Sequence, residues 1–152
     1  MRSRVWCLGL VLLLLIHPVP AEASDPEPPV RVVADGYVLG FDEGPEVVDG
    51  RVMVSLRNLA LFYGFALDYA AETGQVTIKS VDRTVAFTIG STHAAARGEA
   101  ASLDTAPFVR DGRILVPIRF AAEGLGLTVS WDEETRTVYL SGGKAPAPPV
   151  PA

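Results

Sequence analysis

The 152-residue sequence has few of the side chains that most catalytic and metal sites need. It contains one cysteine, Cys7, and two histidines, His17 and His93. A single thiol excludes an intramolecular disulfide and a site built from several thiolates. The longest apolar run, Val5–Ile16, is short, whereas a comfortable bilayer span needs about 20 residues. The sequence therefore predicts a fold that is stabilised by its apolar core.

Residues 1–23 have the pattern of a signal peptide. Arg2 and Arg4 form a basic start, the apolar run follows, and Ala21-Glu22-Ala23 offers small residues at a cleavage site. We expect residues 1–23 to be removed, which would leave no stable membrane span. The alternative is that this segment is kept as an N-terminal anchor. Either way the protein is expected to be secreted or to reside in the cell envelope.

Basic residues are too few to favour nucleic acid. Without residues 1–23 the chain has 11 basic and 17 acidic residues, a net charge of −6, and no basic cluster. Such a surface repels polyanions. Residues 24–29 form a proline-rich lead-in, and residues 143–152 form a Pro/Ala-rich tail that is expected to be flexible.

The sequence between these ends repeats itself. Residues 34–78 align without a gap with residues 96–140 and are identical to them at 15 of 45 positions. We call two residues equivalent when this alignment pairs them. The identities fall on turn residues and apolar positions, which is typical of a duplicated packing unit. We therefore expect two similar halves, about 30–79 and 92–141, within one domain over residues 30–142.

Each half carries the signals of a tight hairpin. Asp49-Gly50 and Asp111-Gly112 separate short apolar runs. Asp-Gly at such a place favours a type I′ turn, because both central residues need a positive φ.

A short helix is expected after each hairpin. Ser55 suits the N-cap of the first helix, and Pro117 suits the first turn of the second. Gly64 and Gly126 stand where a left-handed residue would end each helix. One face of each helix is expected to be buried: Leu56, Leu59, Ala60 and Tyr63 in the first, and Ile118, Ala121, Ala122 and Leu125 in the second.

The period then changes from 3.6 to 2, which indicates strands. Strands are expected over residues 65–69, 75–78, 127–131 and 136–140, with one more over 84–89. Alternation places Tyr69 and Trp131 on the core side and Tyr139 on the outer side. The sequence thus predicts an α+β domain of antiparallel strands, each half being a hairpin, a short helix and a second hairpin.

The residues from Gly98 to Val138 resemble a known module. Their pattern, G-x4-L-D-x2-P-x3-D-G-R-x-L-V-P-I-R-x2-A-E-G-L-G-x-x-V-S-W-D-x-x-T-x-T-V, is similar to the copper amine oxidase-like N-terminal or "stalk" domain of secreted bacterial proteins. Val54-Ser55-Leu56-Arg57 is a degenerate copy of Val116-Pro117-Ile118-Arg119 within that pattern. The resemblance covers about residues 30–141. It implies strands wrapped on helices, a position beside other extracellular modules, and no activity of its own.

The available side chains argue against catalysis and against a cofactor. A copper site of the amine oxidase type needs three imidazoles, and outside the signal segment the chain has only His93. Asp132, Glu133 and Glu134 lie in one expected turn and are better explained as a solvated hairpin tip than as a catalytic pair. We expect no enzyme activity, no metal and no cofactor.

Three residues are the candidates for binding: Arg57, Arg119 and Tyr139. Both arginines follow the strand-to-helix junction, where they could grip a carboxylate or glycan, or instead bridge an acid within their own half. Tyr139 is a single outward aromatic residue, which is a weak platform for a sugar. Asp42 and Asp104, each three residues before a proline, are expected to bond the loop backbone.

These observations favour an exported, non-catalytic structural or interaction module at the cell surface or in the envelope. Its partner would be a protein or a cell-wall component that the sequence does not name. The alternative is a carbohydrate- or peptide-binding module that recruits a partner enzyme. A binder would show a groove with exposed aromatic residues, whereas a scaffold would show a polar surface.

Overall fold

The computed structural model describes residues 26–142. Within that range the chain has an α+β fold of mostly antiparallel strands in three sheets, with two short helices. The expected signal peptide, residues 1–23, and the Pro/Ala-rich tail, residues 143–152, lie outside the described residues. The predicted α+β class, with mostly antiparallel strands and two short helices, is confirmed.

The central sheet has the strand order β10-β11-β4-β3. Its strands are β3 (Glu46–Val48), β4 (Arg51–Ser55), β10 (Phe108–Arg110) and β11 (Arg113–Pro117). Val54 pairs with Val116, while Met53 pairs with Pro117 and Ser55 with Leu115. Val54 and Val116 are equivalent in the sequence alignment, and their neighbours exchange partners. A local two-fold axis therefore passes between these two valines.

The terminal sheet has the order β12-β13-β1-β2. It is formed by β1 (Arg31–Ala34), β2 (Tyr37–Val38), β12 (Thr128–Asp132) and β13 (Thr137–Ser141). β1 runs parallel to β13, with Val32 opposite Val138. The first hairpin of the described chain thus completes a sheet whose other two strands come from the end of that chain.

The five-stranded sheet has the order β5-β6-β7-β8-β9. Its strands are β5 (Ala66–Ala70), β6 (Gln75–Lys79), β7 (Thr84–Thr88), β8 (His93–Ala96) and β9 (Glu99–Ser102). The β8–β9 hairpin stands at the start of the second aligned stretch as β1–β2 stands at the start of the first. It joins, through β7, the strands of the earlier stretch. Each of these hairpins therefore pairs with the sheet that the other stretch of sequence forms.

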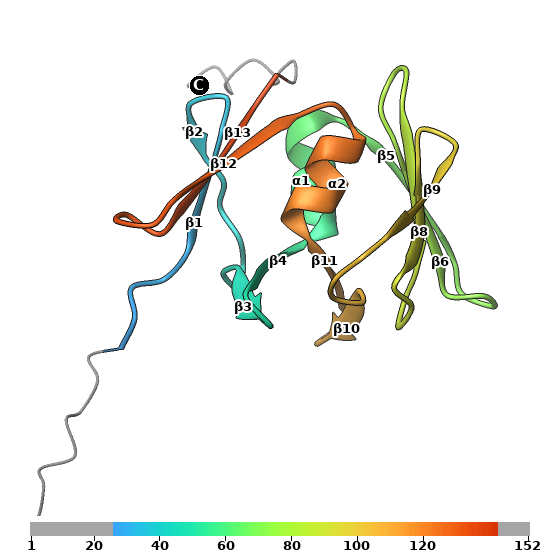
Figure 1. Ribbon diagram of the computed structural model, residues 1–152, viewed down its shortest axis with the longest axis horizontal. Coiled ribbons are helices and arrows are strands. Elements are labelled where there is room, and N and C mark those ends of the chain that lie inside the picture. The colour runs from blue at the N-terminus through green and yellow to red at the C-terminus, as the bar shows by residue number, and fades with distance from the viewer. Residues whose placement is uncertain (1–25, 143–152) are drawn as a thin grey trace, which may run out of the picture.

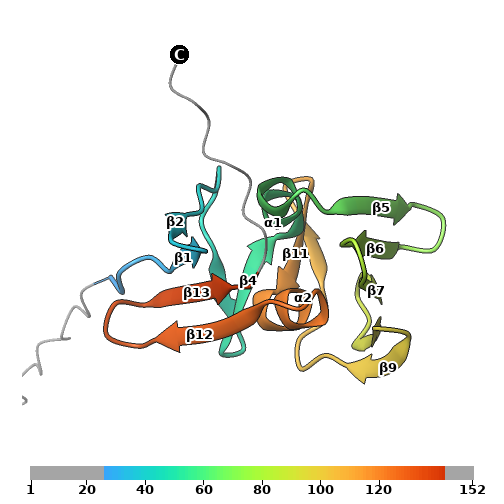
Figure 2. The same ribbon diagram turned by 90° about the horizontal axis from the view of Figure 1, so that it is seen from above.

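Helices α1 (Leu56–Tyr63) and α2 (Ile118–Gly124) lie between the terminal sheet and the five-stranded sheet, and β4 and β11 lead into them (Figures 1 and 2). All the apolar positions expected on the buried helix faces are buried. They meet fully buried side chains from both flanking sheets, among them Val32, Leu140, Ile78 and Phe87. One continuous core therefore joins the helices to both outer sheets.

Ion pairs also connect the two stretches of sequence. Arg51 pairs with Asp104, and Arg113 pairs with Glu43. Arg51 and Arg113 occupy equivalent positions, so the two pairs cross between the stretches in opposite directions. These pairs lie at the surface, where each contributes little to stability, but they show which loops face each other.

The hairpin and helix-end residues behave largely as the sequence predicts. Asp49, Gly50, Asp111 and Gly112 all have positive φ, between 49° and 73°. At the end of α2 the Leu127 N–H donates to the Ala122 carbonyl and the Gly126 N–H to that of Glu123, which is a Schellman motif. The residues before the helices differ from expectation. Pro117 takes the N-cap position of α2 rather than its first turn, and Ser55 makes no side-chain cap bond.

The prediction that Tyr69 faces the core is wrong, since its side chain is 52% exposed. Tyr69 lies on β5, which is an edge strand of the five-stranded sheet. Of the residues in β5 only Leu67 is even partly buried. The alternation of the strand is correct, but an edge strand that extends beyond the helices has nothing to cover it.

Replacing Gly126 with alanine should lower the free energy of unfolding by about 1 kcal/mol or more, because a Cβ is strained at positive φ. Gly126 has φ +89°, and a Cβ there would approach Arg83 Cζ to 2.9 Å. Gly64→Ala, with φ +71° and no neighbour within 4 Å of the added Cβ, should show the loss from backbone strain alone, without the contact to Arg83. Chemical denaturation of both variants checks this. An unchanged or higher stability of Gly126→Ala would contradict the left-handed helix end.

Candidate functional site

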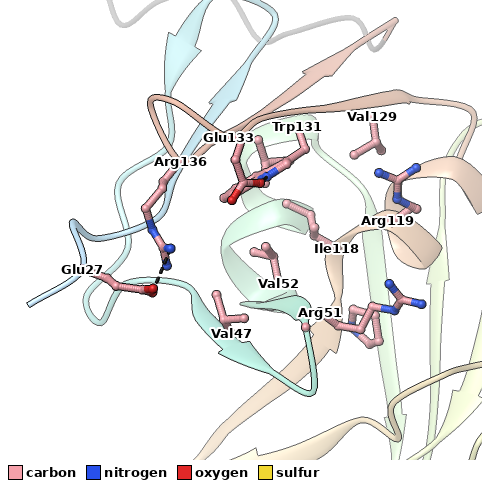
Figure 3. A pocket seen from close by; sticks show the side chains of 13 residues that line it. Glu27, Val47, Arg51, Val52, Ile118, Arg119, Val129, Trp131, Glu133 and Arg136 are labelled. Atoms are coloured by element: carbon pink, nitrogen blue, oxygen red, sulfur yellow. Dashed lines mark hydrogen bonds and ion pairs between the residues drawn. The ribbon is translucent and has the colours of Figure 1, made fainter. Parts of the chain in front are cut away.

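In the described part of the chain, a surface hollow lies where the central sheet meets the terminal sheet. Its volume is about 550 Å³, and Trp131 from β12 forms one wall (Figure 3). Ile118, the first residue of α2, and Val52 of β4 lie on the floor. We call this the Trp131 hollow.

The interior of the Trp131 hollow is mostly aliphatic. Besides Trp131, the apolar side chains that line it come from β3, β4, β11, α2, β12 and β13: Val47, Val52, Pro117, Ile118, Val129 and Val138. Val47 is 49% exposed, so the floor continues to the surface at the β3 edge. A hollow of this composition can accept an apolar group of a ligand.

Charged side chains stand around the rim. Arg119 and Arg51 lie on one side and Arg136 with Glu27 on the other (Figure 3). Arg136 Nη1 is 2.8 Å from Glu27 Oε2, and the Glu27 side chain is 78% exposed. The Nε atom of Arg136 is buried and has no hydrogen-bond partner within residues 26–142. Guanidinium groups placed in this way can bind carboxylates through paired hydrogen bonds.

Arg136 has a strained backbone. Its φ is +49°, in the left-handed region, which costs a residue with a side chain about 1 kcal/mol or more. Gly74, the equivalent residue of the earlier stretch, has φ +68° at the corresponding turn. One turn thus uses glycine, which adopts this conformation without strain, and the other uses arginine.

The acidic turn at the top of the hollow is held by local hydrogen bonds. Trp131 Nε1 donates to Glu133 Oε2 at 2.5 Å. Asp132 Oδ1 accepts the backbone N–H groups of Glu134 and Thr135. The hydrogen bonds from Thr135 hold the pKa of Asp132 below its usual value. These carboxylates therefore shape a hairpin tip, in keeping with the interpretation drawn from the sequence.

The structure separates the three candidate binding residues. Arg119 lines the Trp131 hollow, with Nη1 3.7 Å from Glu123 Oε1 on the next turn of α2. Arg57 is exposed on α1 and forms no ion pair within residues 26–142. Tyr139 is 42% exposed on the outer face of the terminal sheet, opposite Val33 of β1 and away from Trp131. Of these three residues, only Arg119 lines a hollow that an aromatic side chain also lines.

The expectation for Asp42 and Asp104 is not met. Asp104 pairs with Arg51 across the fold. Neither carboxylate accepts a backbone N–H in the described part of the chain. The physical reason is that Arg51 emerges from the Asp49-Gly50 hairpin directly beside the loop that carries Asp104.

Reasoning from the sequence missed Arg51 and Arg136 and placed Trp131 on the core side. Trp131 does pack against the core with one side, while its other side lines the hollow. One signal could have identified Arg136: it replaces a turn glycine of the other stretch.

Within residues 26–142, no group of three or more His, Cys, Asp or Glu side chains is placed to hold a metal ion. His93 is exposed at the first residue of β8. No helix in the described part of the chain is long and apolar enough to cross a membrane.

The chain without residues 1–23, purified without a histidine tag and dialysed, should hold no stoichiometric copper and should oxidise no amine. A lone imidazole binds Cu(II) weakly and without fixed geometry. Metal analysis and an amine oxidation assay check this. One equivalent of copper per chain that is lost in His93→Ala would contradict the expectation and would require ligands shared between chains.

Comparison with protein-family models matches residues 33–140 to the copper amine oxidase N-terminal domain. No curated protein and no solved structure matches the sequence. The matched range spans nearly all of the residues that the structure describes.

Proposed function

Because this chain belongs to the copper amine oxidase N-terminal domain family, a generally non-catalytic family, we propose that it is an exported interaction module of the cell surface or envelope. The observation that carries the proposal is the extent of the match. Residues 33–140 account for almost the whole described chain. The module therefore acts by contact with a partner.

We also propose that the chain consists of two structural repeats. The elements β3 to β6 and β10 to β13 follow one another in the same order, and their bounds are equivalent at every element end but one. The local two-fold axis between Val54 and Val116 supports this. In such an arrangement the shared positions maintain packing, while positions that differ between the repeats are available for binding.

The alternative from the sequence, a carbohydrate- or peptide-binding module that recruits an enzyme, gains one supporting observation. The Trp131 hollow combines an apolar floor with guanidinium groups at its rim. A pure scaffold has no need of such a hollow. A role as an interaction module and a role in recruiting an enzyme are thus compatible, and both would use the Trp131 hollow.

Cell fractionation of the host, followed by intact-mass analysis, tests the location. The protein should be found in the envelope fraction or the medium, with a mass that lacks residues 1–23. Chemical cross-linking in the same fraction should then trap a protein or cell-wall partner. Full-length protein that remains in the cytosol would contradict the proposed function.

A further inference from the structure

We propose that the Trp131 hollow binds an extended acidic peptide, with an apolar side chain on the hollow's floor and a carboxylate at the guanidinium groups of its rim. This inference rests on the interaction role proposed above and names the site and the class of ligand. It is carried by four observations on the described residues.

The first observation is the strain at Arg136. Its turn requires a left-handed residue, and the corresponding turn of the other repeat uses Gly74. Arginine is retained there against its conformational preference, which points to a use for the side chain. Only one of its guanidinium nitrogens meets a carboxylate, that of the exposed Glu27, and the buried Nε has no partner within residues 26–142. The Arg136 side chain is 20% exposed, so a ligand carboxylate at this end of the hollow would compete with Glu27 for the exposed part of the guanidinium.

The second observation is that the two repeats agree on the floor and at the rim arginines Arg51 and Arg119, but differ over the rest of the rim. On the floor, Val47, Val129 and Val138 are equivalent to Val109, Leu67 and Val76, all aliphatic. Packing explains that agreement. On the rest of the rim, in contrast, Trp131, Glu133 and Arg136 are equivalent to Tyr69, Ala71 and Gly74. The second repeat therefore carries a charged, walled hollow that packing alone does not require.

The third observation is charge. Three arginines and two glutamates line the hollow, and two of these arginines, Arg51 and Arg119, also pair with Asp104 and Glu123 through side chains that are more than half exposed. Arg119 is 62% exposed and lies 3.7 Å from Glu123, and exposed pairs of this kind are weak. A ligand carboxylate can replace Glu123 at little cost, and guanidinium forks bind carboxylates in preference to neutral groups.

The fourth observation is that a second hollow, of about 440 Å³, adjoins the first, and Arg51, Pro117 and Arg119 line both. Polar side chains line this second hollow, among them those of Ser102, Asp104 and Arg119. A ligand that fills both must be extended and must offer polar groups along its length. An extended peptide backbone does so.

An aliphatic floor favours a peptide over a glycan. Sugars stack on open aromatic faces and form hydrogen bonds with nearby polar groups, whereas here the floor is formed by valines and isoleucine. The one aromatic wall has its indole N–H already bonded to Glu133. An apolar side chain of a peptide fits this surface, and carboxylates on neighbouring residues would reach Arg136 on one side and Arg119 on the other (Figure 3).

Binding of the fluorescently labelled full chain to an array of random heptapeptides tests the proposal. The bound peptides should be enriched in Asp or Glu next to Leu, Ile, Val or Phe. For the best peptide, fluorescence titration should show at least about tenfold weaker binding in Arg136→Gly and in Arg119→Ala, each of which removes a charge-assisted hydrogen bond. Arg57→Ala, at the position equivalent to Arg119, is the matched control and should bind as the unaltered chain does.

Arg136→Gly separates a binding role from a structural one. Because it installs the residue found at Gly74, it relieves the strained φ and should leave the thermal midpoint unchanged or higher. A lower midpoint with unchanged binding would mean that Arg136 only anchors the lead-in through Glu27, and would overturn the proposal. Absence of acidic enrichment would also overturn it, as would tighter binding of N-acetylglucosamine tetramer than of any peptide. If a cross-linked envelope partner is still found in Arg136→Gly and Arg119→Ala cells, the proposed function stands and only this site is wrong.

Discussion

A chain that ends at Ser91 should show no cooperative unfolding transition, whereas the full chain should show one. The truncation removes β13, which is the partner of β1, and β11, which is the partner of β4. It also removes the β8–β9 hairpin from the five-stranded sheet. What remains has about half the core of a small domain, and domains are stable by only about 5–15 kcal/mol in total. We therefore expect the fragment to lose its folded structure completely.

Circular dichroism during heating measures this. The fragment 92–152, which lacks β1 and β4, is expected to be equally unfolded alone. Mixing the two fragments should restore a cooperative transition, since each supplies the strands that the other lacks. A cooperative transition in the first fragment by itself would show that its stretch of sequence is an independent domain.

Local signals predicted the parts of the fold that depend on a few neighbouring residues. Asp-Gly pairs predicted turns with positive φ, and the glycines after the apolar helix faces predicted the helix ends. In both cases the physical cause lies within a single turn of the chain. Sequence reasoning is reliable at that range because backbone conformation and hydrogen bonding there are settled locally.

The pairing of distant strands could not be predicted in the same way. β1 and β13 lie at opposite ends of the described chain and pair in parallel, yet nothing in Val32 or Val138 names the other as its partner. Alternation tells which side chains share a face, but it does not tell which strand lies at the edge of a sheet. Tyr69 is exposed because its strand lies at such an edge. The Trp131 hollow depends on both kinds of information, because six separate elements meet there.

Gly124→Ala is the point substitution with the largest expected effect among those considered, a loss of about 2 kcal/mol in the free energy of unfolding. Gly124 is the last residue of α2, and a Cβ there would lie 2.4 Å from Val85 Cγ2 and 3.4 Å from Ala96 Cβ. Val85 is fully buried in β7 and is stiff about χ1. It cannot move aside, so the helix must shift away from the five-stranded sheet. Alanine is the better helix former by about 1 kcal/mol, which offsets only part of this cost.

The neighbouring exposed substitution Glu123→Ala is the control and should change stability by about 0.5 kcal/mol or less. Denaturant unfolding of both variants measures the difference. A Gly124→Ala variant as stable as the unaltered chain would mean that α2 and β7 are further apart than the structure places them.

A double-mutant cycle with Val85→Ala identifies the contact responsible. Alone, Val85→Ala should destabilise by about 2 kcal/mol, because it leaves a cavity in the core. In the Gly124→Ala background the same substitution removes the atom with which the new methyl group collides, and the methyl group fills part of the cavity. The two losses should therefore fall short of additivity by at least about 1 kcal/mol. Additive losses would show that Gly124 is required for another reason, such as its backbone conformation at the helix end. The close approach of α2 to the five-stranded sheet would then not require a residue without a side chain.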